Sequence, residues 1–211
     1  MKIALIGASG HIGTEIAKQL ESRSHTVTAL TRPGKSRPPS ASVRAIGVDL
    51  FDTDALAEAI QGHDILASAY APPQDKLGQI SELTNALIAA ARKAGIKRLV
   101  VVGGAGSLEV APGLQLVDTP QFPEAYKGVA LAHRAAFNVL REASDLDWTS
   151  FAPAAMIGPG DKQGGYRVGT SQLLTNTKGE SAISYADYAE AFVTELEQGA
   201  HRQQLVTVAY Q

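Results

Sequence analysis

The sequence predicts a doubly wound α/β fold, in which helices cover both faces of a parallel sheet and a small annex follows at the C-terminal end. Short apolar runs alternate with helical patterns along the chain, which is typical of parallel strands joined by crossover helices. The run at 98–102 is almost entirely apolar, as in a strand buried on both faces. A glycine-rich turn also separates the first apolar run from the first helical pattern.

The first half of the chain contains four expected strands and three expected helices. The strands are placed at the apolar runs 3–6, 26–30, 43–48 and 64–69. The helices are placed at 11–22, at 51–61 and over the apolar face formed by Ile80, Leu83, Leu87, Ile88 and Ala91. Asp52 is an expected N-cap and Gly95 an expected helix stop. Residues 35–40, rich in Pro, Ser and basic side chains, are expected to form a surface loop.

The second half continues the alternation with more irregular sequence. The fifth strand is expected at 98–102 and the sixth at 148–151, with Trp148 in the core. Between them, 103–126 is expected to be a long irregular segment. A helix at 129–143 is expected to bury Leu131, Ala135, Val139 and Leu140. After Pro153, the glycine-rich stretch 158–170 is compatible with a short hairpin. Ser184 and Asp187 match a capping box, whose helix ends at Gly199 before a last strand at 205–208.

Composition excludes several classes of function. The chain has 211 residues, 45% of them apolar, and we expect one domain over residues 1–211, as a monomer or homodimer. A net charge of −2 with scattered cations predicts no nucleic-acid partner. There is no cysteine, and the five histidines show no ligand spacing, so we expect no metal site. The sequence has no stretch of about twenty apolar residues, so we expect no membrane span. We expect a cytoplasmic protein.

The turn at 7–13 reads Gly7-Ala-Ser-Gly10-His-Ile-Gly13, between a predicted strand and a predicted helix. In that context the pattern predicts a Rossmann-like site for the pyrophosphate of NAD(P). Gly7 allows the tight turn, Gly10 the approach of the phosphates and Gly13 the close packing of helix and strand. The first helical amides, at His11 and Ile12, and the hydroxyl of Ser9 can bind phosphate oxygens. The alternative is a plain strand–turn–helix unit of small residues.

The end of the second expected strand distinguishes the two nicotinamide cofactors. NAD sites carry an acidic residue there for the ribose hydroxyl, whereas this chain has Thr31-Arg32-Pro33. A guanidinium suits a 2′-phosphate, so Arg32 favours NADP(H) over NAD(H); otherwise it is a solvated loop cation. Lys35 and Arg37 follow close by. Asp49 and Leu50 are candidates to border the adenine, although Asp49 is equally suited to start a helix.

With these segments the chain resembles the atypical branch of the short-chain dehydrogenase/reductase superfamily. It is similar to NADH-flavin reductases and biliverdin reductase B, and more distantly to NmrA-like proteins. The resemblance rests on GASGHIG at 7–13, VVVGGAGSL at 100–108, LDWTSFAPA at 146–154 and ISYADYAEAF at 183–192. It implies that Ala69 and Tyr70 pass beside the cofactor ribose. It also implies that Gly103 and Gly104 lie near the nicotinamide and that Pro153 turns the chain past the carboxamide.

One departure from the superfamily concerns catalysis. Ordinary members carry a Tyr-x-x-x-Lys pair for proton transfer, and this chain has none. His133 and Tyr126 are the candidate catalytic residues, while His133 is equally suited to a helix surface or cap. Hydride transfer to a flavin or quinone needs little acid help, so we expect an NADPH-dependent oxidoreductase with FMN or FAD as possible substrates. Its small-molecule acceptor is expected between 103–126 and 158–182, within an annex at 153–184. The alternative is an NmrA-like sensor that binds NADP(H) without turnover; nucleotide-sugar epimerase or dehydratase chemistry is a weaker third.

Overall fold

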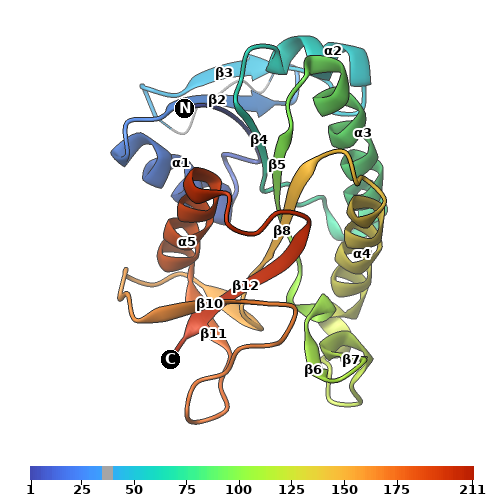
Figure 1. Ribbon diagram of the computed structural model, residues 1–211, viewed down its shortest axis with the longest axis vertical. Coiled ribbons are helices and arrows are strands. Elements are labelled where there is room, and N and C mark those ends of the chain that lie inside the picture. The colour runs from blue at the N-terminus through green and yellow to red at the C-terminus, as the bar shows by residue number, and fades with distance from the viewer. Residues whose placement is uncertain (35–39) are drawn as a thin grey trace.

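The computed structural model of the protein describes residues 1–34 and 40–211. Lys35 and Arg37 of the expected surface loop therefore lie outside the described residues. A central sheet runs through the molecule in the order β10-β12-β8-β5-β4-β1-β2-β3 (Figure 1). Its strands are β1 (Lys2–Ile6), β2 (Thr26–Thr31), β3 (Arg44–Gly47), β4 (Ile65–Ser68), β5 (Arg98–Val102), β8 (Asp147–Ala152), β10 (Tyr166–Thr170) and β12 (Gln204–Tyr210). Every pairing is parallel except β10 with β12.

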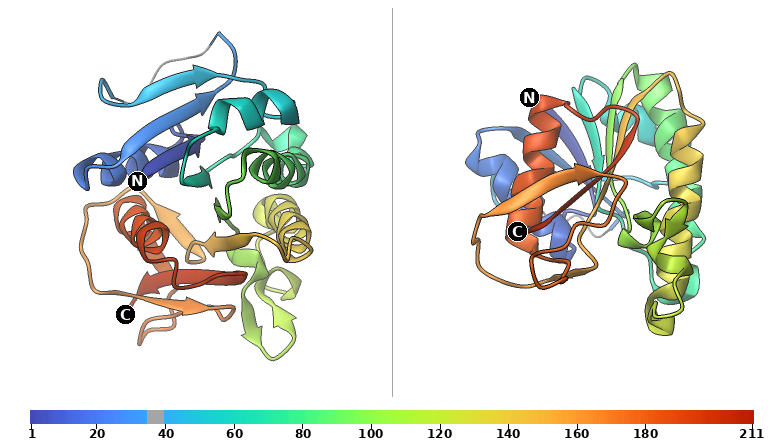
Figure 2. Two further views of the ribbon diagram at one scale, coloured as in Figure 1. Left: turned by 45° about the horizontal axis from the view of Figure 1, so that its top comes forward. Right: turned by 60° about the horizontal axis from the view of Figure 1, so that its bottom comes forward.

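Helices cover both faces of the sheet, which confirms the predicted doubly wound fold (Figure 2). One face carries α1 (His11–Ser22) and α5 (Tyr185–Gln198), and the other carries α2 (Thr53–Ile60), α3 (Gln79–Ala94) and α4 (Glu124–Arg141). Successive strand residues serve opposite faces. On β1, Ile3 and Leu5 pack with α1 and α5, while Ala4 and Ile6 pack with α2 and α3.

Most predicted helix ends are confirmed by their caps. The Asp52 side chain accepts hydrogen bonds from the backbone N–H groups of Asp54 and Ala55. Gly95 and Gly199 end α3 and α5 with left-handed φ angles of 72° and 56°.

Only half of the predicted capping box forms at the start of α5. The Ser184 hydroxyl oxygen accepts from the Asp187 N–H at 3.0 Å. Asp187 does not reach back to the Ser184 N–H, which donates instead to the Tyr210 phenol. Its buried carboxylate accepts from the backbone N–H groups of Gln163 and Gly164 and so holds that loop against α5.

Helix α4 differs from its prediction in both start and face. It begins at Glu124 rather than at 129, and Leu131 and Ala135 are exposed. The buried positions are Ala130, Ala136 and Leu140. The reason is close packing: a Cβ placed on Gly106 would lie 2.7 Å from the Ala130 Cβ. A small residue is therefore required at the contact, and the large Leu131 turns to solvent.

Two segments expected to be irregular or local are built differently. The segment 103–126 contains the hairpin of β6 (Glu109–Ala111) and β7 (Leu114–Gln115) and two short 3₁₀ turns, and it ends in the first residues of α4. The expected hairpin at 158–170 is wrong. Its strand β10 joins the central sheet beside β12, and β9 (Met156–Gly158) pairs with the distant β11 (Ala182–Ser184). Trp148 is buried as expected, against Phe137.

Candidate functional site

The glycine turn lies at the carboxyl edge of the sheet, between β1 and α1. Gly7 has a left-handed φ of 78°, and a Cβ there would overlap the Ala69 carbonyl. A Cβ on Gly13 would overlap the Gly7 carbonyl in the same way. Packing within the protein therefore accounts for both glycines.

Gly10 is different, because packing within the protein does not require it. Its φ of −77° suits any residue, it is exposed, and an added Cβ would meet only the Gly7 carbonyl oxygen, at 3.4 Å. The backbone at Gly10 is therefore open to a group from outside the fold. The open backbone at Gly10 fits a pyrophosphate, which needs such close approach.

The first turn of α1 offers hydrogen-bond donors at the same place. Gly10 caps α1 without a side-chain hydrogen bond. The Gly10 N–H donates to the Gly7 carbonyl at 3.0 Å, and the Thr14 N–H donates to Gly10. The N–H groups of His11, Ile12 and Gly13 lie between them and meet no acceptor within the described residues. Ser9 is exposed beside them. Free amides at a helix start bind anionic oxygens.

An aromatic pair that the motif did not predict borders this turn. The rings of His11 and Tyr185 stack with centroids 5.7 Å apart and planes at 16°. Each is the first residue of its helix, α1 and α5 respectively. The pair joins the glycine turn to the segment that enters α5. Sequence reasoning missed Tyr185, and its one signal was a place directly after the capping Ser184.

Arg32 follows the carboxyl end of β2 and is exposed. Burial raises the pKa of Tyr70, and the positive charge of Arg32 opposes that rise, so the two side chains are close enough to interact. The Tyr70 hydroxyl donates to the Gln79 side chain at 2.9 Å. Its ring meets Phe51 edge-on. Arg32 and Tyr70 thus follow the two strands that flank β1, at the carboxyl edge of the sheet.

Asp49 and Leu50 lie between β3 and α2. The Asp49 carboxylate accepts from the Phe51 N–H at 3.0 Å, in the turn before α2, whose N-cap is Asp52. Asp49 is exposed, whereas Leu50 is buried in the core beneath α2.

The other predicted cofactor residues follow β4, β5 and β8 at the same edge. Ala69 donates its N–H to the carbonyl of Ile6, and Gly103 donates its own to Phe151. A Cβ on Gly103 would lie 2.7 Å from the Ser150 Oγ, and one on Gly104 would lie 2.7 Å from the His133 Cβ. Packing against the Ser150 hydroxyl and the His133 methylene therefore favours glycine at both positions. Pro153 is buried just after β8.

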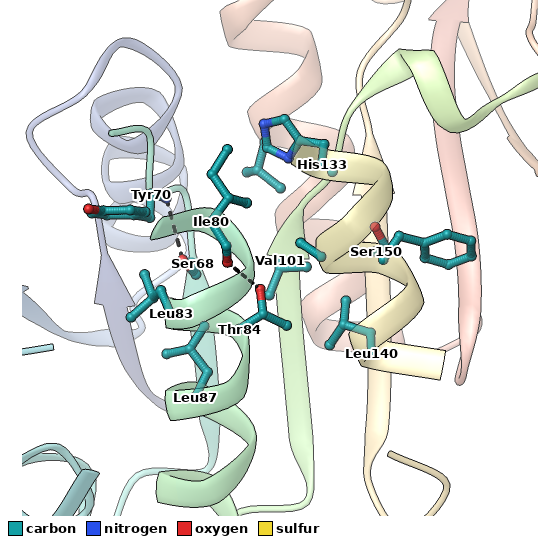
Figure 3. Close-up of a pocket in the computed structure, with 14 residues that line it drawn as sticks. Ser68, Tyr70, Ile80, Leu83, Thr84, Leu87, Val101, His133, Leu140 and Ser150 are labelled. Carbon is teal, nitrogen blue, oxygen red and sulfur yellow. Dashed lines mark hydrogen bonds between the residues drawn. The ribbon is translucent and has the colours of Figure 1, made fainter. Parts of the chain in front are cut away.

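A small cavity opens beside Gly103, between α3, α4 and the strand ends (Figure 3). It has room for about 20 Å³ and is lined by apolar side chains with a few polar groups, among them Ser68, Ser150 and His133. Burial lowers the pKa of His133 from 6.5 to about 4. The imidazole is therefore neutral at physiological pH.

The two catalytic candidates are not brought together. Tyr126 lies in the first turn of α4, 63% exposed, and His133 lies seven residues further along. Seven residues correspond to a rise of about 10 Å. Arg134, next to His133, forms an ion pair with Asp118 at 2.7 Å and so links α4 to the short 3₁₀ turn that contains Asp118. Ser107 is buried, and its hydroxyl has no partner in the described part of the chain.

These features define a dinucleotide-binding α/β protein with its site at the carboxyl edge of the sheet. The family profile for NAD(P)H-binding proteins matches residues 7–199. The chain belongs to this family, which lies within the atypical short-chain dehydrogenases/reductases, as the resemblance implied.

Similar proteins carry several descriptions. YwnB of Bacillus subtilis, an uncharacterised protein, is 40% identical over 99% of this chain and 98% of its own. A 3-diazoavenalumate denitrifying reductase of a Streptomyces species is 30% identical over 76% of this chain and 58% of its own length.

Solved structures also match closely. A candidate exported protein of Burkholderia pseudomallei is 52% identical with a TM-score of 0.93, over 100% of both chains. A candidate NADH-flavin reductase of Streptococcus pneumoniae is 35% identical with a TM-score of 0.92, over 100% of both chains. A candidate epimerase of Bacteroides thetaiotaomicron is 34% identical with a TM-score of 0.89, over 99% of this chain and 96% of that one.

Within residues 1–34 and 40–211, none of the helices combines the length and the apolar character needed to cross a membrane.

Proposed function

We propose that this protein is an NADPH-dependent oxidoreductase that transfers hydride to a flavin or quinone. The observation that carries the proposal is Gly10: an open, exposed glycine that internal packing does not require, beside three free amides of α1. The similarity to a candidate NADH-flavin reductase and to a denitrifying reductase supports the reductase class.

The preference for NADPH over NADH rests on Arg32. No acidic side chain follows β2 up to Gly34, and the positive charge of the exposed guanidinium acts on Tyr70. A guanidinium pairs with phosphate oxygens through two parallel hydrogen bonds, which suits the 2′-phosphate. Tyr70, held by Gln79, would then border the ribose.

The chain's own residues hold and shield the reacting groups. When bound, the cofactor supplies a hydride from its nicotinamide ring. Gly104 is partly exposed after β5 and carries no side chain of its own, so the flat rings would approach the backbone there. Neutral His133 offers one N–H donor beside this backbone, and a donor there would stabilise negative charge that develops on the acceptor.

We place the acceptor between the segments 103–126 and 158–182, within the annex at 153–184. The two segments are joined by backbone hydrogen bonds of Glu109 with Ser171 and Leu173. The carboxylate of Asp187 anchors the loop at Gln163 and Gly164. Exposed Met156 on β9 and Tyr126 on α4 supply apolar surface for a flat acceptor.

The test measures NADPH oxidation from the loss of nicotinamide absorbance, with FMN, FAD or a quinone as acceptor. We expect turnover with at least one acceptor and slower turnover with NADH. Gly10→Val serves as the binding-deficient control. The missing Tyr–Lys pair is equally compatible with a sensor of the NmrA type, so tight NADPH binding without turnover on any acceptor would overturn the enzyme in favour of the sensor.

A further inference from the structure

Four hydrogen-bond donors from three separate segments converge on the carboxylate of Asp187, in the first turn of α5. The backbone N–H groups of Gln163 and Gly164 donate to its two oxygens at 2.9 and 3.0 Å. The Ser184 hydroxyl donates at 3.0 Å and the Tyr210 hydroxyl at 2.6 Å. A carboxylate offers about four lone-pair sites, so this one is fully occupied. The strands β10, β11 and β12 gather near the start of α5 (Figure 1).

Hydrogen bonds from uncharged groups keep this carboxylate ionised. The Asp187 side chain is completely buried. Burial alone would raise the pKa of Asp187, yet the hydrogen bonds from the four donors bring it below the ordinary value of a carboxyl. The start of α5 also favours negative charge through the helix dipole. The carboxylate therefore binds its donors more strongly than a neutral acceptor would.

The loop 159–165, which two of these bonds hold, has little packing of its own. It is exposed apart from Gly164 and contains no helix or strand. Gly164 and Gly165 have left-handed φ angles of 67° and 66°, and an added Cβ would meet nothing within 4 Å at either position. The loop is also tied by one backbone hydrogen bond to the Gly165 carbonyl and by Lys162, which pairs with Glu190 at 2.6 Å. A partly exposed ion pair contributes little, so the buried carboxylate is the main attachment.

The same carboxylate braces the strand that precedes the loop. The last residue of β9, Gly158, pairs with Ser184 of β11, whose hydroxyl belongs to the cluster. At the other end of β9, Met156 is 70% exposed on the wall where we place the acceptor. The cofactor turn is attached to α5 by a different contact, the stack of Tyr185 on His11. The two sides of the site therefore depend on different groups at the start of α5.

We propose that Asp187 and Tyr210 are positioning residues that fix the loop 159–165 and β9, and thereby set the affinity for the acceptor and not for the cofactor. The Tyr210 hydroxyl donates to the carboxylate and accepts from the Ser184 N–H at 3.1 Å. One phenol thus joins the end of β12 to the end of β11. The effect on the acceptor rests on the proposed function, whereas the hold on the loop does not.

Amide hydrogen exchange, followed by NMR for Gln163 and Gly164 individually, tests the hold on the loop without turnover. Asp187→Asn keeps the shape of the side chain but turns one acceptor oxygen into a donor, which then faces another donor. Exchange of both amides should become at least about tenfold faster, because hydrogen bonds to a charged group are stronger than neutral ones. Tyr210→Phe, the milder variant, removes one donor to the carboxylate and should speed the same exchange about threefold or more.

Tyr188→Phe is the matched control. Tyr188 follows Asp187 on α5, and its buried hydroxyl donates to the carbonyl of Phe151, a strand residue outside the loop, at 2.5 Å. The control removes a comparable buried hydrogen bond and should leave the exchange of the loop amides unchanged. If Asp187→Asn does not fold, Tyr210→Phe decides alone. Unchanged exchange in the clamp variants that fold, or an equal acceleration in the control, would overturn the hold on the loop.

Steady-state kinetics test the effect on the acceptor, with FMN or, if the protein reduces that instead, a quinone. Tyr210→Phe should raise the KM for the acceptor about threefold to tenfold and leave kcat and the Kd for NADPH unchanged. An unchanged KM despite faster loop exchange, or an equal loss of NADPH affinity, would overturn the positioning role and leave the proposed function standing. If the unmodified protein reduces none of these acceptors, the proposed function fails, and the exchange rates still decide whether Asp187 holds the loop.

Discussion

Replacing Gly10 by valine should separate cofactor binding from folding. The added side chain meets only the Gly7 carbonyl oxygen, and the φ of −77° suits valine. The loss of a favourable N-cap glycine and the reduced freedom of the unfolded chain oppose each other, so the free energy of unfolding should change by about 1 kcal/mol or less. For a chain of this size, Tm should move by roughly 2–4 °C.

Cofactor affinity should fall far more. The valine occupies the space through which the pyrophosphate approaches the free amides of His11, Ile12 and Gly13. Hydrogen bonds to a charged group are worth about 1.5–3 kcal/mol each, so losing two raises the Kd for NADPH by at least about a hundredfold. Fluorescence titration measures the Kd, and thermal unfolding checks the fold.

Gly78→Val is the matched control, because Gly78 is also a helix N-cap with a negative φ and open space around it. It should bind NADPH as the unmodified protein does. A folded Gly10→Val protein with a Kd within about threefold of the original, less than 1 kcal/mol, would refute the placement of the pyrophosphate. Gly13→Val is no substitute, since its Cβ overlaps the Gly7 carbonyl and folding itself should fail.

Three further changes test other parts of the site. Arg32→Asp should raise the Kd for NADPH about ten- to a hundredfold and leave that for NADH nearly unchanged, in parallel titrations; equal losses would contradict the role of Arg32. Because burial lowers the pKa of His133 from 6.5 to about 4, the unfolded chain binds more protons, and stability falls as pH drops through 6.5. Between pH 7.5 and 4.5, the free energy of unfolding of the original protein, measured in urea, should fall by up to about 2.5 kcal/mol more than that of His133→Gln. Parallel curves of unfolding free energy against pH would disprove this. Tyr185→Ala should weaken NADPH binding about threefold to tenfold by releasing His11, with Tyr185→Phe unaffected; identical binding by both variants would exclude the stack from the site.

Local patterns explain which parts of the fold were predictable. Strands such as β5 and caps such as Asp52 and Gly95 depend on a few consecutive residues, and the structure has them where the sequence places them. Which face of α4 is buried depends on how closely the helix approaches Gly106. The spacing of apolar residues along the helix carries no information on that contact. The strand β10 pairs with β12 some forty residues later, and such non-local pairing leaves no mark in a window of ten residues.

In the site, too, features within one continuous segment were predictable and features that depend on distant segments were not. The turn at 7–13 is one continuous segment, so its spacing alone placed the open backbone and the free amides together. Tyr185 reaches that turn only because α1 and α5 share one face of the sheet. Ser150 lies inside a buried strand, and only the fold brings it to the cavity wall together with His133 of α4.

Gly103 and Gly104 combine a role suggested by the local sequence with contacts that only the fold creates. In the sequence they directly follow an expected strand, and the family resemblance implies that they lie near the nicotinamide. In the structure each contacts a different side chain, Ser150 or His133, which would have to shift if a Cβ were added. Small residues at this point therefore let the Ser150 hydroxyl and a neutral imidazole pack directly against the backbone. A site built this way can hold a proton donor near the reacting rings without the Tyr–Lys pair, because the donor's charge state is set by burial instead of by a neighbouring lysine.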